Sequence, residues 1–330
     1  LGLLGFFKYF VFVQANLNMI LRAFGRGTFE IMKVVLPTGI SFYTFQSMSY
    51  TIDVCRGRAK VASALLDFAC YVSLFPQLIA GPIVRYRDLA SQLSERSHTI
   101  NKLAMGVSFF ILGFAKKTLL ANPMGEVADA AFNAGSLIWY DAWVGVAAYA
   151  FQIYFDFSGY SDMAIGLGLM LGFQFPKNFD SPYRADSMTD FWRRWHISLS
   201  SWLRDYLYIP LGGNRRGARR TYINLAVVML LGGFWHGAKW TFVIWGGVHG
   251  LLLAFERMIG KDSVYRAFPR PVRIAITFII TLITWVFFRA VNLTSAIRFL
   301  GAMFGLRRPS TEASLLGPII YSRYHIIIFI

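Results

Sequence analysis

Long apolar runs alternate with short polar or basic segments along this chain. Many runs approach the roughly 20 residues that an α-helix needs to cross the hydrocarbon core of a bilayer. The run at 34–52 carries Pro37, Gly39 and several hydroxyl groups, which indicates a broken helix that lines a protein interior. The pattern predicts an all-α, polytopic membrane protein. Its expected helices or spans cover 1–21, 34–52, 61–83, 103–122, 137–155, 163–175, 222–255 (enough for two passages or for one long broken one), 273–291 and 316–330.

One polar stretch, residues 187–209, interrupts this apolar pattern. Ser187 followed by Asp190 resembles a capping box, and Pro210 supplies a stop. His196 lies at the edge of the apolar stripe and is the first candidate for chemistry. The stripe, with three- and four-residue steps, predicts one continuous amphipathic helix. The apolar stripe consists of Met188, Phe191, Trp192, Trp195, Leu199, Trp202 and Tyr206.

Composition supports the membrane interpretation. Hydrophobic residues make up 56% of the 330 residues, charged residues only 15%, and the mean hydropathy is +0.48, which excludes an ordinary soluble domain. Lys and Arg outnumber Asp and Glu by 33 to 17, but they sit in short linkers, as in cytoplasmic loops. We therefore expect contact with membrane lipid and not with nucleic acid. Cys55 and Cys70 lack metal-ligand spacing, so no metal site is expected.

A single membrane domain is expected over residues 1–330. Leu1 stands inside an apolar run, and Ile330 ends another run before it reaches the length of a span. We therefore expect this domain to have further N- and C-terminal portions.

Asp156 and Asp162 stand in an apolar setting. A carboxylate within the membrane is costly unless it is paired or hydrated, so such residues indicate function, here the lining of a tunnel. The alternative is that both aspartates cap the broken ends of two helices. The sequence leaves both interpretations open.

Four arginines follow the polar stretch in a short turn: Arg215, Arg216, Arg219 and Arg220. The positive-inside rule predicts that this turn is cytoplasmic. A phosphate-bearing ligand is the alternative explanation for the same cluster.

His236 lies in Phe234-Trp-His-Gly237, and His249 follows thirteen residues later. An imidazole in apolar surroundings stays neutral near pH 7 and is able to accept a proton, as a general base must. The alternative is a histidine that only bonds a neighbouring helix. For His249, the adjacent Gly250 and nearby Trp245 favour that alternative.

Several motifs together resemble the membrane-bound O-acyltransferase (MBOAT) family, especially its bacterial alginate O-acetyltransferase branch. The motifs cover nearly the whole chain and are specific in combination. They are Leu78-Ile-Ala-Gly-Pro82, Tyr154-Phe-Asp-Phe-Ser-Gly-Tyr-Ser-Asp-Met-Ala-Ile-Gly-Leu-Gly168, Phe191-Trp-Arg-Arg-Trp-His196, Trp202-Leu-Arg-Asp-Tyr-Leu-Tyr-Ile-Pro-Leu-Gly-Gly-Asn214 and Phe234-Trp-His-Gly237.

The resemblance implies the MBOAT fold, with short amphipathic helices, a thin core and a central funnel. His236 is then the catalytic histidine and His196 a second active-site residue. An acetyl group passes from a cytoplasmic thioester such as acetyl-CoA, the donor substrate, across the bacterial inner membrane to an exopolysaccharide such as alginate, usually with a periplasmic acetyltransferase partner.

Further site residues follow from this resemblance and from the chemistry of acyl transfer, which needs a base and a donor for the oxyanion. Trp192 and Asn214 are expected to bind the acyl donor. His196, Asn214 or a backbone N–H is expected to stabilise the oxyanion or to orient the donor. The four arginines are expected to attract its phosphates. Trp235 is expected to line the tunnel beside His236.

Two other functions stay open from the residues alone. A transporter or flippase for a lipid-linked sugar would use the intramembrane Asp and His residues to relay protons. A membrane scaffold would leave the chemistry to its partner. The sequence also leaves the acceptor open among alginate, cellulose, another exopolysaccharide and peptidoglycan.

Overall fold

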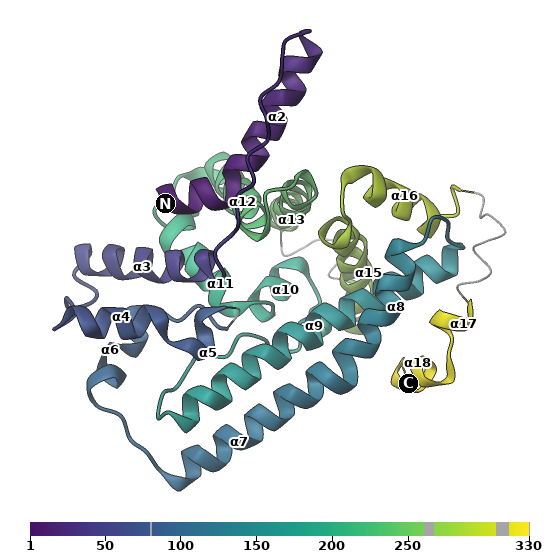
Figure 1. Cartoon of the computed structure of the whole chain (residues 1–330). Coiled ribbons are helices and arrows are strands. Elements are labelled where there is room, and N and C mark those ends of the chain that lie inside the picture. Colours follow the sequence, from purple (N-terminus) through teal and green to yellow (C-terminus); the bar gives the residue numbers. More distant parts are fainter. Residues whose placement is uncertain (80, 261–266, 308–316, 330) are drawn as a thin grey trace.

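The computed structural model describes residues 1–79, 81–260, 267–307 and 317–329, and every regular element in these ranges is helical (Figure 1). This confirms the predicted all-α class. Four helical stretches have the length and composition to cross a membrane: Gly2–Ala23, Ile100–Asn133, Trp240–Ile259 and Arg270–Arg289. The protein is therefore a multi-pass membrane protein, as its apolar pattern predicted.

The helices differ widely in length, from single turns to one helix of 32 residues. In chain order they are α1 (Gly2–Leu4), η1 (Gly5–Tyr9), α2 (Phe10–Ala23), α3 (Ile40–Cys55), α4 (Leu65–Ser73), α5 (Phe75–Leu78), α6 (Tyr86–Ser94), α7 (Ile100–Ala115), η2 (Lys116–Ala121), α8 (Asn122–Asn133), α9 (Trp139–Met170), η3 (Pro182–Arg184), α10 (Met188–Arg194), α11 (Ile197–Leu203), η4 (Arg204–Tyr208), α12 (Gly217–His236), α13 (Trp240–Ile259), α15 (Arg270–Arg289), α16 (Leu293–Met303), α17 (Gly317–Ile320) and α18 (Arg323–Phe329).

Some predicted spans agree with these bounds and others do not. The run 222–255 forms two helices, α12 and α13, which is one of the two arrangements that the sequence left open, and 273–291 matches α15. The run 61–83 is no single span, because the extended backbone at Leu74 separates the short helices α4 and α5. The run 34–52 becomes helical only at Ile40. The run 316–330 falls partly outside the described residues.

Helix α9 is continuous over 32 residues, so the predicted division into 137–155 and 163–175 is wrong. Its neighbour is the path α7–η2–α8, which continues past the expected end at Lys116 and Lys117. The two lysines pair with carboxylates of α9: Lys117 with Asp156, and Lys116 with Asp162 at 2.6 Å between Nζ and Oδ2. Because these charges are paired, α9 continues through Asp156 and Asp162, and the path α7–η2–α8 continues through Lys116 and Lys117. The sequence alone suggested a helix end at each of these places.

Glycines bring α7 and α9 close together. A Cβ atom at Gly106 would lie 2.7 Å from the carbonyl oxygen of Gly166, and a Cβ at Gly166 would lie 2.5 Å from that of Gly106. Gly113 and Gly159 repeat this contact about two turns away. Small residues at such positions allow the backbones of membrane helices to pack tightly. The α7–α9 pair is the long side of the molecule in Figure 1.

The prediction of one helix over 187–209 is wrong. The stretch divides into α10, α11 and η4, and the break falls at His196, which has a left-handed φ of 45°. Only half of the predicted capping box is present: Ser187 Oγ accepts a hydrogen bond from Asp190 N at 3.1 Å, whereas the Asp190 carboxylate accepts from Arg194 Nε at 2.8 Å.

The preceding segment causes this break. The N–H of Asp180 donates to the Arg194 carbonyl at 2.9 Å, and the N–H of Ile197 donates to the Asn178 carbonyl at 2.9 Å. These bonds occupy backbone groups that a continuous helix would pair internally. The pKa of the Asp180 carboxyl is lowered by a hydrogen bond from Lys177, by the charge of Lys177 and, to a smaller extent, by the charge of Arg194.

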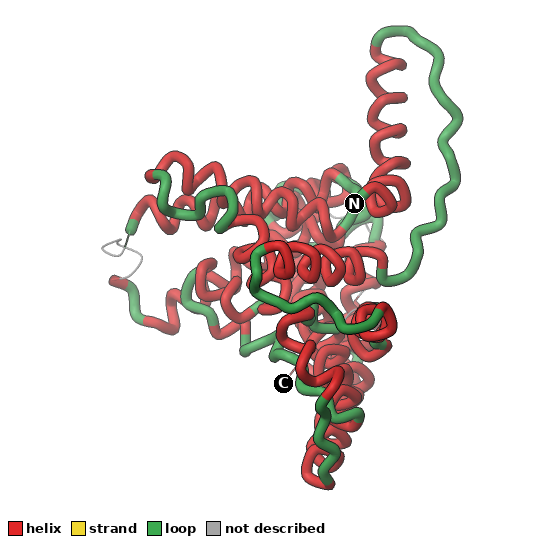
Figure 2. The backbone as a smooth tube through the Cα atoms, turned by 90° about the vertical axis from the view of Figure 1, so that its left-hand side faces the viewer, coloured by secondary structure: helices red, strands yellow, loops and turns green. Residues whose placement is uncertain are grey.

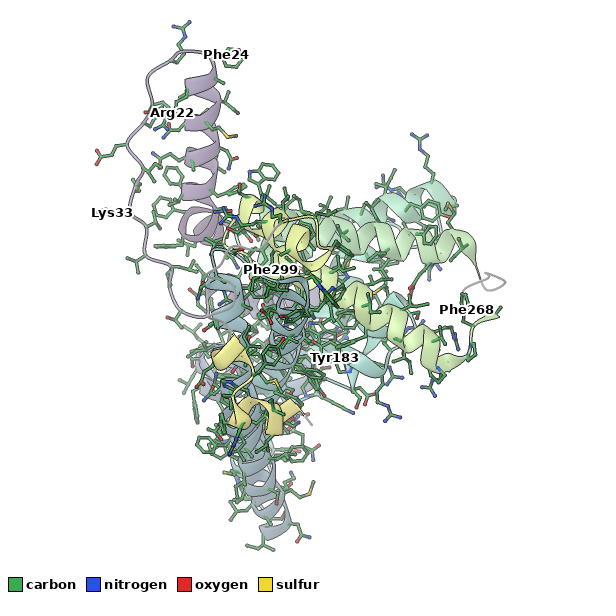
Figure 3. All side chains as sticks on the ribbon, turned by 90° about the vertical axis from the view of Figure 1, so that its right-hand side faces the viewer. Arg22, Phe24, Lys33, Tyr183, Phe268 and Phe299 are labelled. Carbon is green, nitrogen blue, oxygen red and sulfur yellow. The ribbon has the colours of Figure 1, made fainter. Side chains whose placement is uncertain are left out.

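The largest cluster of buried apolar side chains lies among α8, α9, α10, α13, α15 and α16. Helix α2 and the loop after it project from this body (Figure 2). Figure 3 shows Arg22, Phe24 and Lys33 on that projection, whereas Tyr183 and Phe299 lie in the body. Phe191 and Trp195, just before the break at His196, belong to this cluster, whereas Leu199 and Trp202, just after it, belong to a second one.

Candidate active site

One cavity of about 350 Å³ contains both histidines that the sequence analysis singled out. His196 reaches it from the break between α10 and α11, and His236 from the end of α12. The full lining is Lys8, Ser41, Phe42, Ile153, Asp156, Phe157, Tyr160, Trp195, His196, Trp235, His236, Trp245, Trp285 and Phe288. The fold therefore brings together two imidazoles from motifs 40 residues apart in the sequence.

His236 is the last residue of α12 and stands in an aromatic wall. Its ring centroid lies 5.0 Å from Trp235, 5.5 Å from Trp245 and 5.0 Å from Phe288. Within the described part of the chain, neither ring nitrogen has a hydrogen-bond partner. Both nitrogens are therefore available to a substrate in the cavity.

The place of His236 depends on a close contact between α12 and α13. A Cβ atom at Gly233 would lie 3.1 Å from the Cα of Gly246, so a larger side chain would separate the helices. Only three residues, 237–239, connect the two helices. The end of α12 is thereby held against the aromatic residues of α13.

His196 is held more firmly than His236. It is only 1% exposed, and its Nδ1 lies 3.1 Å from Oδ1 of Asn178. The ring of Phe157 meets the imidazole edge-on, with centroids 4.6 Å apart. Burial and this contact give the side chain a single orientation at the cavity wall.

Lys8 is a cavity residue that the sequence analysis did not single out. Its ammonium group donates to Ser41 Oγ at 2.7 Å and to the carbonyl of Trp235, and it lies 5.3 Å from the Trp235 ring centroid. No described carboxylate lies within ion-pair distance of it. The signal was present in the sequence, because a lone lysine inside an apolar span is itself a functional indication.

The two aspartates of α9 have different positions. Asp156 lines the cavity together with Trp235, and the role of both in a tunnel stays a prediction. Asp162 lines a neighbouring cavity of about 530 Å³ that Asn178 also borders. The capping interpretation is wrong for both residues, because α9 is unbroken and each carboxylate pairs with a lysine.

Trp192 lies away from the cavity lining and contacts His249. Its indole Nε1 donates to His249 Nδ1 at 3.2 Å, and His249 Nε2 lies 3.1 Å from Thr284 Oγ1. Since Thr284 Oγ1 donates in turn to the Thr281 carbonyl, His249 Nε2 is the donor to Thr284. His249 therefore links three helices, as the packing interpretation expected.

The arginine turn lies at the other end of α12 from His236. Asn214, Arg215 and Arg216 border a separate pocket of about 400 Å³ and are exposed, like Arg219 and Arg220. From Arg220 to His236 the helix advances 16 residues, roughly 24 Å. Asn214 and these arginines are thus separate from the histidine cavity.

Comparison with known proteins identifies a family over most of the chain. The family described as MBOAT, membrane-bound O-acyltransferase family, matches residues 58–297. That range includes both histidines, the aspartates of α9 and the arginine turn.

Three relatives illustrate the breadth of the similarity. The chain is 53% identical to a probable alginate O-acetylase of Pseudomonas putida, over 92% of this chain and 62% of that protein. It is 43% identical to a peptidoglycan O-acetyltransferase of Helicobacter pylori, over 92% and 63%. It is 33% identical to a teichoic acid D-alanyltransferase of Streptococcus thermophilus, over 68% and 59%. The chain thus spans about 60% of the length of these relatives. Because the family match covers most of the chain, this protein belongs to the membrane-bound O-acyltransferase family.

Proposed function

We propose that this protein is a membrane O-acetyltransferase that takes an acetyl group from a cytoplasmic thioester, of the acetyl-CoA type, for the O-acetylation of an exopolysaccharide such as alginate. The observation that carries the proposal is the shared cavity of His196, His236 and Lys8. The alginate O-acetylase named among the relatives supports the choice of acceptor. The peptidoglycan enzyme makes a second polysaccharide acceptor the natural comparison.

The proposed reaction uses the free nitrogens of His236. His236 takes the proton of an acceptor hydroxyl while that oxygen attacks the thioester carbonyl carbon. The new C–O bond gives a tetrahedral oxyanion, and the Lys8 ammonium is the cation in the cavity that is able to stabilise it. When the C–S bond breaks, His236 returns the proton to the departing thiolate.

The donor is proposed to approach from the end of α12 that carries Arg215, Arg216, Arg219 and Arg220. Basic residues favour the cytoplasmic side of a membrane. The antiparallel neighbours support this orientation, because Arg257 near the end of α13 and Arg270 at the start of α15 lie at the same end. The guanidinium groups are suited to the phosphates of a coenzyme A donor.

The expected location is the bacterial inner membrane, with polysaccharide on its outer side. Delivery to that polysaccharide is proposed to be direct or through a periplasmic acetyltransferase partner. The alternative function, a transporter that relays protons, has less support, because α9 is continuous and Asp156 and Asp162 are paired with lysines.

Acetyl ester content of the surface polysaccharide tests the proposal. The protein is expressed in alginate-producing cells that lack their own acetylase but keep its partners, as wild type, as His236→Ala and as His98→Ala. His98 is exposed and does not line the cavity, so it is a matched histidine control. We expect esters with the wild type and His98→Ala but none with His236→Ala at equal membrane content. Esters that persist with His236→Ala would support a scaffold instead.

A further inference from the structure

We infer that Asn178 is a positioning residue that fixes the tautomer of His196, so that His196 accepts a hydrogen bond in the cavity and does not donate one to the oxyanion. The inference deepens the proposed function and rests on it for the role of His196 in acyl transfer. The tautomer itself depends only on the contacts around Asn178.

The orientation of the Asn178 amide follows from an unambiguous donor. The backbone N–H of Ser198 lies 3.2 Å from the Asn178 side-chain atom that also faces His196. A backbone N–H only donates, so this atom must be the amide oxygen. The amide nitrogen then donates to Ser161 Oγ at 3.1 Å. All four residues are buried, which leaves this network little freedom.

The amide oxygen in turn fixes the proton on His196. An oxygen cannot donate, so the contact of 3.1 Å requires a proton on His196 Nδ1. In the neutral imidazole, Nε2 then carries a lone pair. No described residue bonds that nitrogen, although His196 lines the cavity. A hydroxyl group of the acceptor sugar is the chemical class of partner that this lone pair suits.

This arrangement gives His196 and Lys8 different roles in acyl transfer. Neutral His196 has no proton on Nε2 to offer an oxyanion, whereas the Lys8 ammonium does carry protons into the cavity. His196 therefore orients the hydroxyl group of the acceptor, and Lys8 stabilises the oxyanion that forms at the thioester carbonyl. His249 has the opposite tautomer, since Trp192 donates to its Nδ1.

Nitrogen NMR of protein labelled at histidine, in lipid nanodiscs, tests the tautomer directly. The signals that disappear in His196→Gln and in His249→Gln identify the ring nitrogens of these two histidines. We expect His196 with Nδ1 protonated and His249 with Nε2 protonated. In Asn178→Ala the His196 signal should move toward a mixture of tautomers, and in Asn178→Asp it should keep Nδ1 protonated, because a carboxylate oxygen also accepts.

Acyl transfer provides the second readout. We expect Asn178→Ala to reduce transfer about 10- to 100-fold, the range seen when a partner that orients a metal-bound histidine is removed. Asn178→Asp should recover most of it. Ser158→Ala is the matched control, because Ser158 of α9 is also buried but its hydroxyl has no hydrogen-bond partner among the described residues. It should change neither the tautomer nor the rate.

The outcomes separate the two proposals. Protonated Nε2 on His196 in the wild type, or an unchanged tautomer and rate in Asn178→Ala, would overturn the positioning role. If Asn178→Ala fails to insert, the tautomer of the wild type and the tautomer and transfer rate of Asn178→Asp still decide between these outcomes. A wild-type protein with the expected tautomer but no acyl transfer would overturn the proposed function alone.

Discussion

Replacement of Lys8 by Met is the change that tests the electrostatics of the cavity most sharply. An ammonium group has three N–H donors. Two of them bond Ser41 Oγ and the carbonyl of Trp235, so one remains for the reacting carbonyl oxygen. Met keeps the length and the apolar stem of Lys but has no charge and no donor. The variant therefore removes one oriented, charged hydrogen bond from the proposed transition state.

The expected loss follows from the single remaining donor. Removal of one oxyanion donor in an enzyme costs about 2.7–4 kcal/mol, or roughly 10²- to 10³-fold in kcat. We expect a loss of this size in Lys8→Met, with a smaller change in KM, because the oxyanion exists only during the reaction. Ser41→Ala removes one anchor and leaves the charge, so its loss should be smaller.

The assay is the initial rate of thiol release from the thioester donor in membranes that contain acceptor and partner. Lys33→Met is the matched control, because Lys33 is exposed on the projecting loop (Figure 3). Equal insertion of each variant is checked by its amount in the membrane fraction. A kcat of Lys8→Met that equals those of the wild type and Lys33→Met would refute the oxyanion role.

Two further changes test the helix contact and the donor side. Gly113→Ala puts a Cβ 2.7 Å from the backbone N of Met163, so we expect it to destabilise the protein by about 1–3 kcal/mol. Gly125→Ala, whose nearest neighbour would be 3.5 Å away, should be neutral or stabilising by thermal unfolding in detergent, and equal behaviour of the two would contradict the close packing. Arg219→Gln or Arg220→Gln should raise KM for the thioester roughly 2- to 5-fold at unchanged kcat, as for an exposed charge contact. The exposed Arg22→Gln is the control, and an unchanged KM in both arginine variants would remove them from the donor site.

Sequence patterns predicted the helices that depend on local hydrophobicity. Run length alone predicted the span at α15 and left the division of 222–255 into α12 and α13 as one of two alternatives. The continuity of α9 was missed, because polar residues within an apolar run look like a break until their lysine partners on η2 are known. Those partners are about 40 residues away in the sequence and adjacent only in the fold.

The break at His196 was missed for a related reason. Its residues repeat with helical spacing, but the preceding segment, around Asn178, takes the backbone hydrogen bonds that would continue the helix. Tertiary hydrogen bonds overrode the local pattern. The histidines could be found from their motifs, and Lys8 could have been found as a lone lysine inside an apolar span. Asn178 is recognisable as a site residue only from the side chains that the fold places beside it.

The central claim is that acyl groups pass through the cavity that His236 lines. Isotopically labelled acetyl thioester, added to inside-out membrane vesicles with the acceptor polysaccharide and its partner in the lumen, tests it most directly. We expect label to reach the polysaccharide with the wild type and with His98→Ala, and to remain on the thioester with His236→Ala. Label that reaches the polysaccharide equally well with His236→Ala would contradict the account.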